Sequence, residues 1–359
     1  MHISSQYGAT NIVNTQTAGY QINPNITSLI SGGYMITWAS QNPGDGTFDI
    51  HAQRYEADAS TYGPNFAVAN NVTANQIFPA VANSRTTGNT TMFVWSSNSG
   101  GSEYDVFGRI FNNSTPITGD ILINSVAVMN NQLYPRISGI SNGNFVVAWS
   151  DAYNHAGNVY ASIISPTGTA IGSIITVNSP YGFAVNYPWV IGLSATDPYY
   201  PGGFVISYLK EFATSDDRYI LAFRAYASDG LTFGSEVIVG TNSVVSSISD
   251  GLQSGDYIPD GGFILAYYQN YNANPAYYNS GDNMVGTSSS VVGVLGDVLS
   301  SPANILPLSS YSGQFIIGEE ITIYSSAAGG FLVTERILDV VYSPPTANIT
   351  LDKIGRAHV

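Results

Sequence analysis

The chain has 359 residues, of which 44% are hydrophobic and only 9% are charged, and its formal net charge is −14. So acidic a chain repels phosphate backbones, which excludes nucleic acid as an expected partner. Because there is no cysteine, disulfide frameworks and thiolate metal sites are excluded as well. No stretch reaches the roughly 18 consecutive apolar residues that span a bilayer, so we expect no membrane insertion.

A repeat of between fifty and sixty residues organises the chain, and its expected strands follow one order in every unit. The first unit contains, in chain order, Ile12-Val13-Asn14, Gln21, Pro24, Gly32-Gly33-Tyr34-Met35-Ile36-Thr37-Trp38 and Asp49-Ile50-His51-Ala52-Gln53-Arg54-Tyr55. Continuous apolar runs are typical of buried strands, and alternating runs are typical of strands with one wet face. Each unit therefore predicts four short strands, the fourth being the Val-Asn run that opens the next unit.

The same order returns five more times, with drift in the later units. The predicted units lie near residues 12–63, 64–119, 120–172, 173–234, 235–307 and 308–352. A four-stranded unit cannot bury its own faces, but units stacked radially can. We therefore predict an all-β fold, a β-propeller of four-stranded blades with six blades recognisable and six or seven in the whole ring. A string of small β-sandwiches is the alternative, although the units are short for that fold.

Trp38, Trp95 and Trp149 occupy the same place in the first three units, and we expect them to pack between neighbouring blades. The run Ile12-Val13-Asn14 matches the end of a unit yet comes first, so we expect it to complete the last blade. Residues 353–359, Lys-Ile-Gly-Arg-Ala-His-Val, look like the translation of a sequencing adapter. We expect them to be an assembly artefact, an ordinary frayed terminus being the alternative.

This pattern resembles a repeat of very large secreted bacterial proteins of the adhesin-like and RTX-associated type, which also occurs in some eukaryotic microbes. The matching residues run from Val13-Asn14 through Gln21, Pro24, Gly32-Gly33-Tyr34 and Trp38 to Ala52-Gln53-Arg54-Tyr55. The resemblance implies an extracellular or cell-surface module of a larger protein, monomeric by itself. The N-terminal residues lack the layout of a signal peptide, so we expect the targeting segment to be missing from this sequence. The glycine-rich calcium nonapeptides are absent, so calcium binding does not transfer.

Residues that could carry chemistry are few. Asp45 and Asp49 are weak calcium candidates, since carboxylates are hard oxygen ligands, but the run Asn42 to Asp49 equally indicates a structural turn. We therefore expect no cofactor, with calcium possible. Asn154 and His155 lie in a loop expected at the propeller rim. His51 is expected on a sheet face, and Glu319 and Glu320 point to opposite faces of a strand, so they form no catalytic pair.

The preferred binding candidate is the insertion from Gln269 to Asn279, where tyrosines lie beside asparagines. Tyrosine offers an apolar face for a sugar ring and amides offer partners for hydroxyl groups. Its candidate binding residues are Tyr271, Asn274, Tyr277 and Tyr278. We expect a non-catalytic binding or adhesion scaffold, whose ligand is a glycan or a protein held by rim loops. The alternative is a propeller carbohydrate-active enzyme, sialidase-like or lyase-like, with its site over the central channel.

Overall fold

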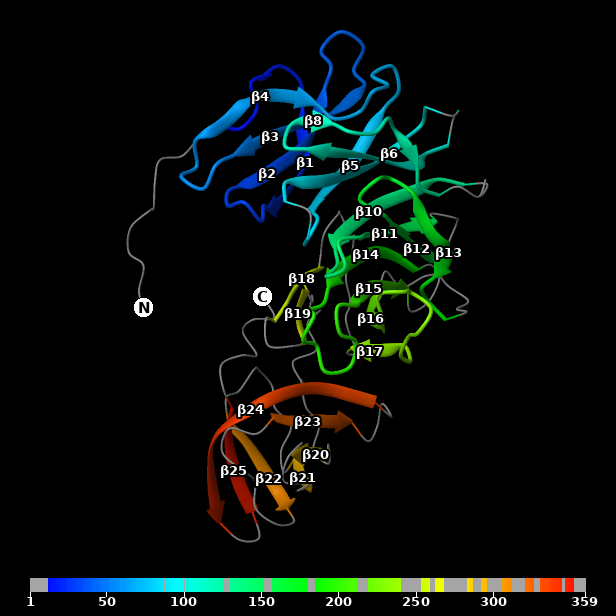
Figure 1. The fold of residues 1–359 in the computed structure, drawn as a ribbon. Helices are drawn as coiled ribbons and strands as arrows, with labels where there is room; N and C mark the ends of the chain where they lie inside the picture. The colour runs from blue at the N-terminus through cyan, green and yellow to red at the C-terminus, as the bar shows by residue number, and fades with distance from the viewer. Residues whose placement is uncertain are drawn as a thin grey trace.

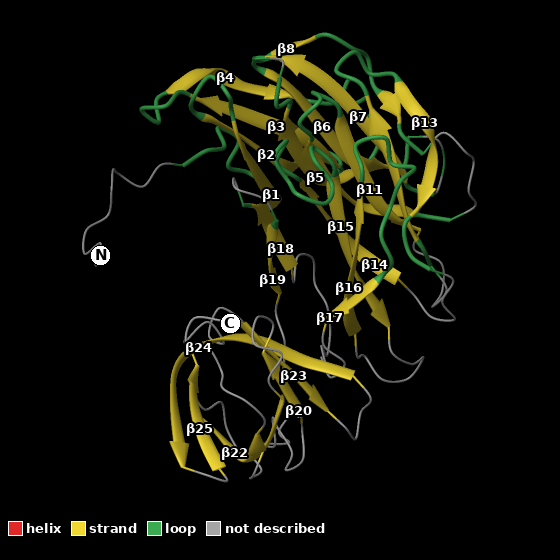
Figure 2. Ribbon diagram, turned by 60° about the horizontal axis from the view of Figure 1, so that its bottom comes forward, coloured by secondary structure: helices red, strands yellow, loops and turns green. Residues whose placement is uncertain are grey.

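The computed structural model describes most of the first 267 residues and the backbone of six later strands. The described ranges are 12–86, 88–99, 101, 103–124, 130–151, 157–179, 185–211, 219–239, 253–258 and 262–267, with strands between 283 and 351. Strands and loops make up these residues, and no helix occurs among them (Figure 2). Accordingly, no described helix could cross a membrane. The predicted all-β class is confirmed.

Four antiparallel sheets follow one another along the chain, and we call them blades one to four (Figure 1). Blade one contains β1 (Gln21–Ser28), β2 (Tyr34–Gln41), β3 (Phe48–Tyr55) and β4 (Thr61–Ala67). Blade two contains β5 (Gln76–Asn83), β6 (Thr90–Ser97), β7 (Asp105–Asn112), β8 (Thr115–Pro116) and β9 (Ile121–Leu122), the last two both pairing with β7. Blade three contains β10 (Gln132–Gly139), β11 (Phe145–Asp151), β12 (Val159–Ile164) and β13 (Ala170–Thr176). Blade four contains β14 (Val185–Gly192), β15 (Phe204–Glu211), β16 (Tyr219–Tyr226) and β17 (Val237–Val239).

The first strand of each blade is the inner strand, and successive inner strands lie beside one another. β1 contacts β5, β5 contacts β10, and β10 contacts β14. The row continues to β18 (Gln253–Tyr257), which pairs with β19 (Phe263–Tyr267). This radial arrangement of four-stranded antiparallel sheets is that of a β-propeller, as predicted.

The core lies between the blades, because each sheet buries both faces against its neighbours. Trp95 packs with Met35 and Ile50 of blade one, and Trp149 packs with Met92 and Val94 of blade two. Tyr208 takes the corresponding place between blades three and four. All three side chains are at most 1% exposed. The expected packing of the tryptophans between blades is confirmed for Trp95 and Trp149.

The Val-Asn runs lie after the fourth strands, not within them as predicted. Val68 follows β4 and Val177 follows β13. Asn124 and Asn178 each accept a hydrogen bond from the first valine of the preceding third strand, Val106 at 2.9 Å and Val159 at 2.8 Å. These asparagines hold the end of the third strand in place. The Val-Asn pattern does recur between successive units, but its asparagine binds the end of the third strand and does not form a fourth strand.

The stretch Ile12 to Asn14 forms no strand, although we expected it to complete the last blade. The Val13 carbonyl accepts a hydrogen bond from the Asn65 side chain of β4 at 3.2 Å. In blades two and four, Arg109 and Arg224 donate in the same way to the carbonyls of Val68 and Val177. The Val13 carbonyl therefore contacts blade one in the way that the carbonyls of Val68 and Val177 contact blades two and four.

Residues 283–351 pair as a closed barrel in the order β20-β21-β22-β25-β24-β23. Its strands are β20 (Asn283–Gly286), β21 (Val292–Leu295), β22 (Ile305–Tyr311), β23 (Glu320–Ser325), β24 (Gly330–Ser343) and β25 (Thr346–Leu351). Both views place this barrel beside the blades (Figures 1 and 2). The pairing differs from the further four-stranded blade expected near 308–352, because long β24 pairs with β23 at one end and β25 at the other. The number of blades in the whole ring stays a prediction.

Candidate functional site

Each inner strand of the four blades carries a β-bulge at one shared position, immediately before a proline. The bulged residues Asn23, Phe78, Tyr134 and Tyr187 have φ angles of 52°, 54°, 56° and 55°. The strand register shifts at the same place in all four blades. Proline is tolerated here because it cannot donate to a ladder and is confined to edge strands and bulges. The repeated proline of the sequence therefore marks a built bulge, and the residue before it is turned out of the regular pleat.

The bulges carry a conformational cost that the sequence does not minimise. A left-handed backbone costs a residue other than glycine roughly 1–2 kcal/mol, and asparagine tolerates it better than other residue types. Three of the four positions hold Phe78, Tyr134 and Tyr187 instead of asparagine. The neighbouring blade holds one of these bulges, since the Ser150 hydroxyl of blade three accepts the backbone N–H of Tyr187 at 3.0 Å. Strain that the surrounding structure holds in place points to a functional position.

The three aromatic rings form a continuous row across the inner strands, which we call the aromatic collar: Phe78, Tyr134 and Tyr187. The ring centroids of Phe78 and Tyr134 are 4.5 Å apart with an interplanar angle of 45°. Those of Tyr134 and Tyr187 are 4.6 Å apart with an angle of 43°. All three side chains are half-buried. The collar thus offers a curved apolar surface on the axis of the blades.

A hollow of about 320 Å³ lies at the Phe78 end of the collar, and we call it the channel pocket; Phe78 is the collar ring that lines it. Its lining comes from the inner strands of all four blades: Asn23, Pro24, Asn25, Phe78, Pro79, Arg136 and Trp189. The Arg136 guanidinium lies 5.6 Å from the centroid of the Trp189 ring. The Trp189 indole donates to the carbonyl of Gly255 on β18 at 3.1 Å. The pocket therefore combines aromatic faces, amides and one cation.

The opposite ends of the same inner strands pack tightly together. A Cβ on Gly139, the last residue of β10, would lie 2.3 Å from the Asn83 carbonyl oxygen, and one on Gly192 would lie 2.3 Å from the Gly139 carbonyl oxygen. Arg85 crosses this end from blade two and donates to the carbonyls of Gly192 at 2.8 Å and Leu193 at 3.1 Å. The inner strands therefore leave room for a ligand at the collar end and not at the Arg85 end.

A buried carboxyl group lies at the collar end of blade three. Asp151 closes β11, is 7% exposed and accepts a hydrogen bond from Gln132 at 3.3 Å. Gln132 begins β10, the strand that carries Tyr134. Burial raises the pKa of Asp151, and hydrogen bonds from Gln132 and Asn130 oppose part of that rise. A carboxyl with a raised pKa can hold a proton for transfer.

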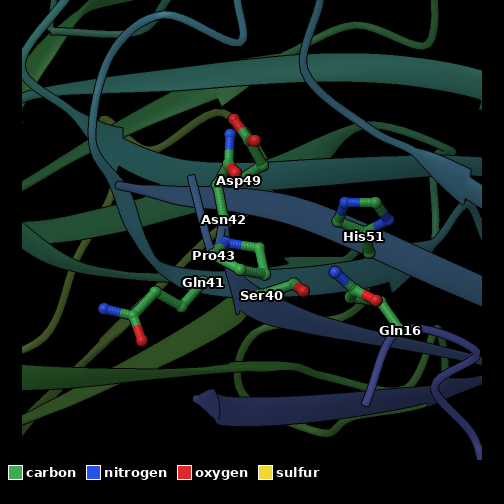
Figure 3. A pocket seen from close by; sticks show the side chains of 7 residues that line it. All are labelled: Gln16, Ser40, Gln41, Asn42, Pro43, Asp49 and His51. Carbon is green, nitrogen blue, oxygen red and sulfur yellow. The ribbon is translucent and has the colours of Figure 1, made fainter. Parts of the chain in front are cut away.

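A second hollow, of about 300 Å³, lies on blade one and is lined by polar side chains (Figure 3). His51 and Asp49 of β3 both line it, and His51 stacks on Trp38 with ring centroids 6.3 Å apart. Burial lowers the pKa of His51, which favours the neutral imidazole. His51 lies on a face of the sheet at β3, as expected. Asp49 places a buried oxygen, Oδ1, without a hydrogen-bond partner.

The weak calcium candidates Asp45 and Asp49 have different surroundings. Asp45 accepts hydrogen bonds from the Thr47 backbone at 3.0 Å and the Thr47 hydroxyl at 2.7 Å, which is a turn of the kind the sequence indicated. Asp49 is half-buried, and burial together with the charge of Asp45 raises its pKa. Among the residues that the structure describes, no group of three or more His, Cys, Asp or Glu could hold a metal ion. Asp45 is therefore part of the turn, whereas Asp49 lies on β3.

One largely buried polar cluster lies in blade four, and the backbone N–H of Ser179, beyond the last strand of blade three, donates to it at 3.4 Å. The Tyr208 hydroxyl donates to Glu236 at 2.5 Å, and the Lys210 ammonium lies 2.7 Å from the same carboxylate. Burial raises the pKa of Tyr208, and the hydrogen bond to Glu236 raises it further. Burial also acts to raise the pKa of Glu236, but the hydrogen bonds from Lys210 and Tyr208 lower it overall. Because Tyr208 is fully buried, the cluster is structural.

The predicted binding residues Tyr271, Asn274, Tyr277, Tyr278, Asn154 and His155 lie outside the described residues, so these predictions stay open. The glutamate pair is described in part, with the backbone of Glu320 opening β23. The sequence reasoning missed the aromatic collar. A signal was available, because the proline of the repeat follows an aromatic residue at Phe78, Tyr134 and Tyr187.

Comparison with known proteins identifies the fold. No family model and no curated protein matches the chain. A protein of unknown function from Dyadobacter fermentans has a TM-score of 0.50 at 10% identity, covering 95% of this chain and 97% of that one. The α-L-arabinanase of Penicillium chrysogenum, complexed with arabinobiose, has a TM-score of 0.47 at 10% identity, with 93% and 94% covered. The α-L-arabinofuranosidase of Fusarium graminearum, also with arabinobiose, has a TM-score of 0.48 at 10% identity, with 96% and 97% covered.

These similarities bear on the expected function as follows. At this level of identity they show the fold alone, an all-β propeller. The expectation of a non-catalytic binding or adhesion scaffold is contradicted, because the similar structures of named activity are mostly carbohydrate-active enzymes. The chain is similar in fold to such proteins and is assigned to no family.

Proposed function

We propose that this chain is a carbohydrate-active propeller enzyme that holds a glycan at the aromatic collar and acts on it there. The observation that carries the proposal is the collar itself, in which three rings stand on strained bulges at one position of successive blades. Regular strands at these positions would avoid the left-handed backbone and its cost. Binding of a ligand that needs the rings in this arrangement explains why the strained backbone is kept.

The chemistry of the channel pocket fits a sugar. One face of a pyranose or furanose ring carries C–H groups and packs on aromatic faces, while its hydroxyl groups need amide and carbonyl partners. Phe78 and Trp189 supply aromatic faces in the pocket, and Asn23 and Asn25 supply amides. The similar arabinanase and arabinofuranosidase are complexed with arabinobiose, which agrees with a sugar-sized ligand on this fold.

Cleavage of a glycosidic linkage requires a proton for the leaving oxygen, and water to bond to the anomeric carbon in its place. The candidate proton donor is Asp151, which lies at the collar end of blade three outside the lining of the channel pocket. It is buried, its pKa is raised, and Gln132 ties it to the strand of Tyr134. Because polysaccharide substrates occur outside the cell, we also propose that the protein is extracellular or at the cell surface. The resemblance to repeats of secreted proteins agrees with this location.

The test is glycan binding and product release with a collar variant. Tyr134→Ala removes the central ring of the collar, and we expect about 10-fold weaker binding, equivalent to about 1.4 kcal/mol. Affinity electrophoresis over a panel of arabinans, galactans and pectins measures binding, and reducing-end assays measure turnover. In the same assays Asp151→Asn should retain binding and lose turnover.

The matched control is Tyr199→Ala, because Tyr199 is 84% exposed and belongs neither to the aromatic collar nor to the lining of the channel pocket. It should bind and cleave like the unchanged protein. The proposal is wrong if no glycan of the panel is bound, or if Tyr134→Ala binds and cleaves as well as the control.

A further inference from the structure

The polar hollow of about 300 Å³ on blade one has no role in the proposed function, and we call it the blade-one pocket. Its lining includes Ser40 of β2 and both Asp49 and His51 of β3 (Figure 3). Ser40 pairs directly with Asp49 across the two strands, and His51 follows Asp49 by two residues. Side chains at such positions lie on the same face of a sheet. The hydroxyl, the carboxyl and the imidazole therefore share one small surface.

The protein satisfies the carboxyl group of Asp49 incompletely. Its Oδ1 atom is buried and has no hydrogen-bond partner among the described residues. No lysine or arginine belongs to the described lining of the pocket. Burial and then the charge of Asp45 raise the pKa of Asp49, so folding disfavours its ionised form. A ligand that brings a positive charge together with N–H donors would offset this cost.

The other polar side chains of the pocket suit a ligand with a cation and hydroxyl groups. Burial lowers the pKa of His51, and a neutral imidazole offers one donor and one acceptor without repelling a cation. The Ser40 hydroxyl can donate or accept. The Gln41 amide, which also lines the pocket, accepts the Tyr20 backbone N–H at 3.2 Å and donates to the Gly46 carbonyl at 3.2 Å. This part of the lining is therefore held in place by the protein itself.

From this arrangement we propose that the blade-one pocket binds an amino sugar, with the ammonium group of the sugar on the Asp49 carboxylate. Ring hydroxyl groups of the sugar contact the Ser40 hydroxyl and the His51 imidazole. A protonated amine supplies both the charge and the donors that Asp49 lacks, whereas a neutral sugar supplies donors alone. A metal ion fits less well, because it needs several ligands and no group of three or more His, Cys, Asp or Glu gathers among the described residues.

The charge and the position of the pocket agree with a separate site for a cationic ligand. The net charge of −14 favours the approach of a cation. A volume of about 300 Å³ lies at the lower end of the range for pockets that hold small organic molecules. No residue lines both this pocket and the channel pocket. The inference therefore goes beyond the proposed function and does not depend on it.

Three small sugars separate the contributions: glucosamine, N-acetylglucosamine and glucose. NMR titration of the full chain at about pH 6, where an amine is protonated, should show at least about 10-fold tighter binding of glucosamine than of either neutral sugar. Asp49→Asn should abolish this preference, because it keeps the shape of the side chain and removes its charge. Asp58→Asn is the matched control, since it removes a carboxylate of the same blade outside the pocket lining, and it should keep the preference. Circular dichroism verifies that both variants are folded.

Several outcomes would overturn the assignment. Equal binding of the three sugars would do so, as would a preference for glucosamine that survives in Asp49→Asn. Binding that disappears when a chelator removes divalent metal ions would show that a metal occupies the pocket instead. Tyr134→Ala should keep the preference for glucosamine, and its loss in that variant would move the amine to the collar. Binding of glycans at the collar is measured with different ligands, so the proposed function can stand or fail independently.

Discussion

At the scale of single residues, two aspartates of blade one show how local contacts decide whether the pKa of a carboxyl group is raised or lowered. Asp58 accepts a hydrogen bond from the Ser60 backbone at 3.0 Å. The hydroxyl and the backbone N–H of Ser60 lower the pKa of Asp58. Burial, and then the charge of Asp45, raise the pKa of Asp49. The ionised form is therefore favoured by folding at Asp58 and disfavoured at Asp49.

The same substitution should consequently act in opposite directions at the two positions. A raised pKa means that the stabilising contribution of protonated Asp49 is complete at low pH and is lost as pH rises through its folded-state pKa. Asp49→Asn should then raise the free energy of unfolding at pH 7 and have no charge-related effect near pH 3, below the usual aspartate pKa of about 3.9. Urea unfolding at the two pH values measures this.

Asp58→Asn is the matched control. Because its pKa is lowered, the stability from ionised Asp58 is present above about pH 3.9 and is lost as pH falls through its folded-state value. Asp58→Asn should therefore lower the free energy of unfolding at pH 7. Equal signs for the two variants at pH 7 would contradict this account.

At the scale of the elements, the inner strands determine where a ligand can enter. Their collar ends are separated by bulges and aromatic rings, while their other ends approach through glycine. The predicted order of four strands in each unit included these strands but not their bulges. A residue before proline normally prefers an extended backbone, so no local rule places Phe78, Tyr134 or Tyr187 in the left-handed region. The contacts between blades decide that conformation.

The close approach at the Arg85 end predicts a strong requirement for Gly139. A methyl group at this position would meet the Asn83 carbonyl, a backbone atom, at 2.3 Å. Gly139→Ala should destabilise the protein by about 1–3 kcal/mol, since one strand must move. Gly119→Ala is the control, because its Cβ would meet nothing within 4 Å, and it should be neutral or slightly stabilising. Thermal unfolding of both variants measures the difference, and similar melting temperatures would refute the steric explanation.

At the scale of the whole molecule, Arg85 links blades that are distant in sequence. It donates to blade four at Gly192 and Leu193, and its guanidinium stacks on Tyr257 of β18 at 4.3 Å. Burial lowers the pKa of Arg85, and the Tyr257 and Asp256 charges oppose that change. An arginine side chain nevertheless stays ionised in proteins. Arg85 therefore holds a cationic cross-link at the closed end of the channel.

Removing the Arg85 cross-link should lower the free energy of unfolding of the blades that it connects. Arg85→Met retains much of the side-chain volume and removes two hydrogen bonds from a charged donor, each contributing about 1.5–3 kcal/mol. We expect the free energy of unfolding, measured by denaturation with guanidinium chloride, to fall by about 3 kcal/mol. A loss below about 0.5 kcal/mol would show that the cross-link contributes little to the assembled ring.

The sequence by itself determined the repeat, the all-β class and the packing of Trp95 and Trp149, because these follow from the period and polarity of each unit. It also contained the prolines of the bulges without revealing what they do. Only the tertiary structure decided that Phe78, Tyr134 and Tyr187 meet as a collar and that Arg136 joins the same pocket. The physical reason is that these residues lie one blade apart, and their neighbourhood exists only once the inner strands are placed side by side.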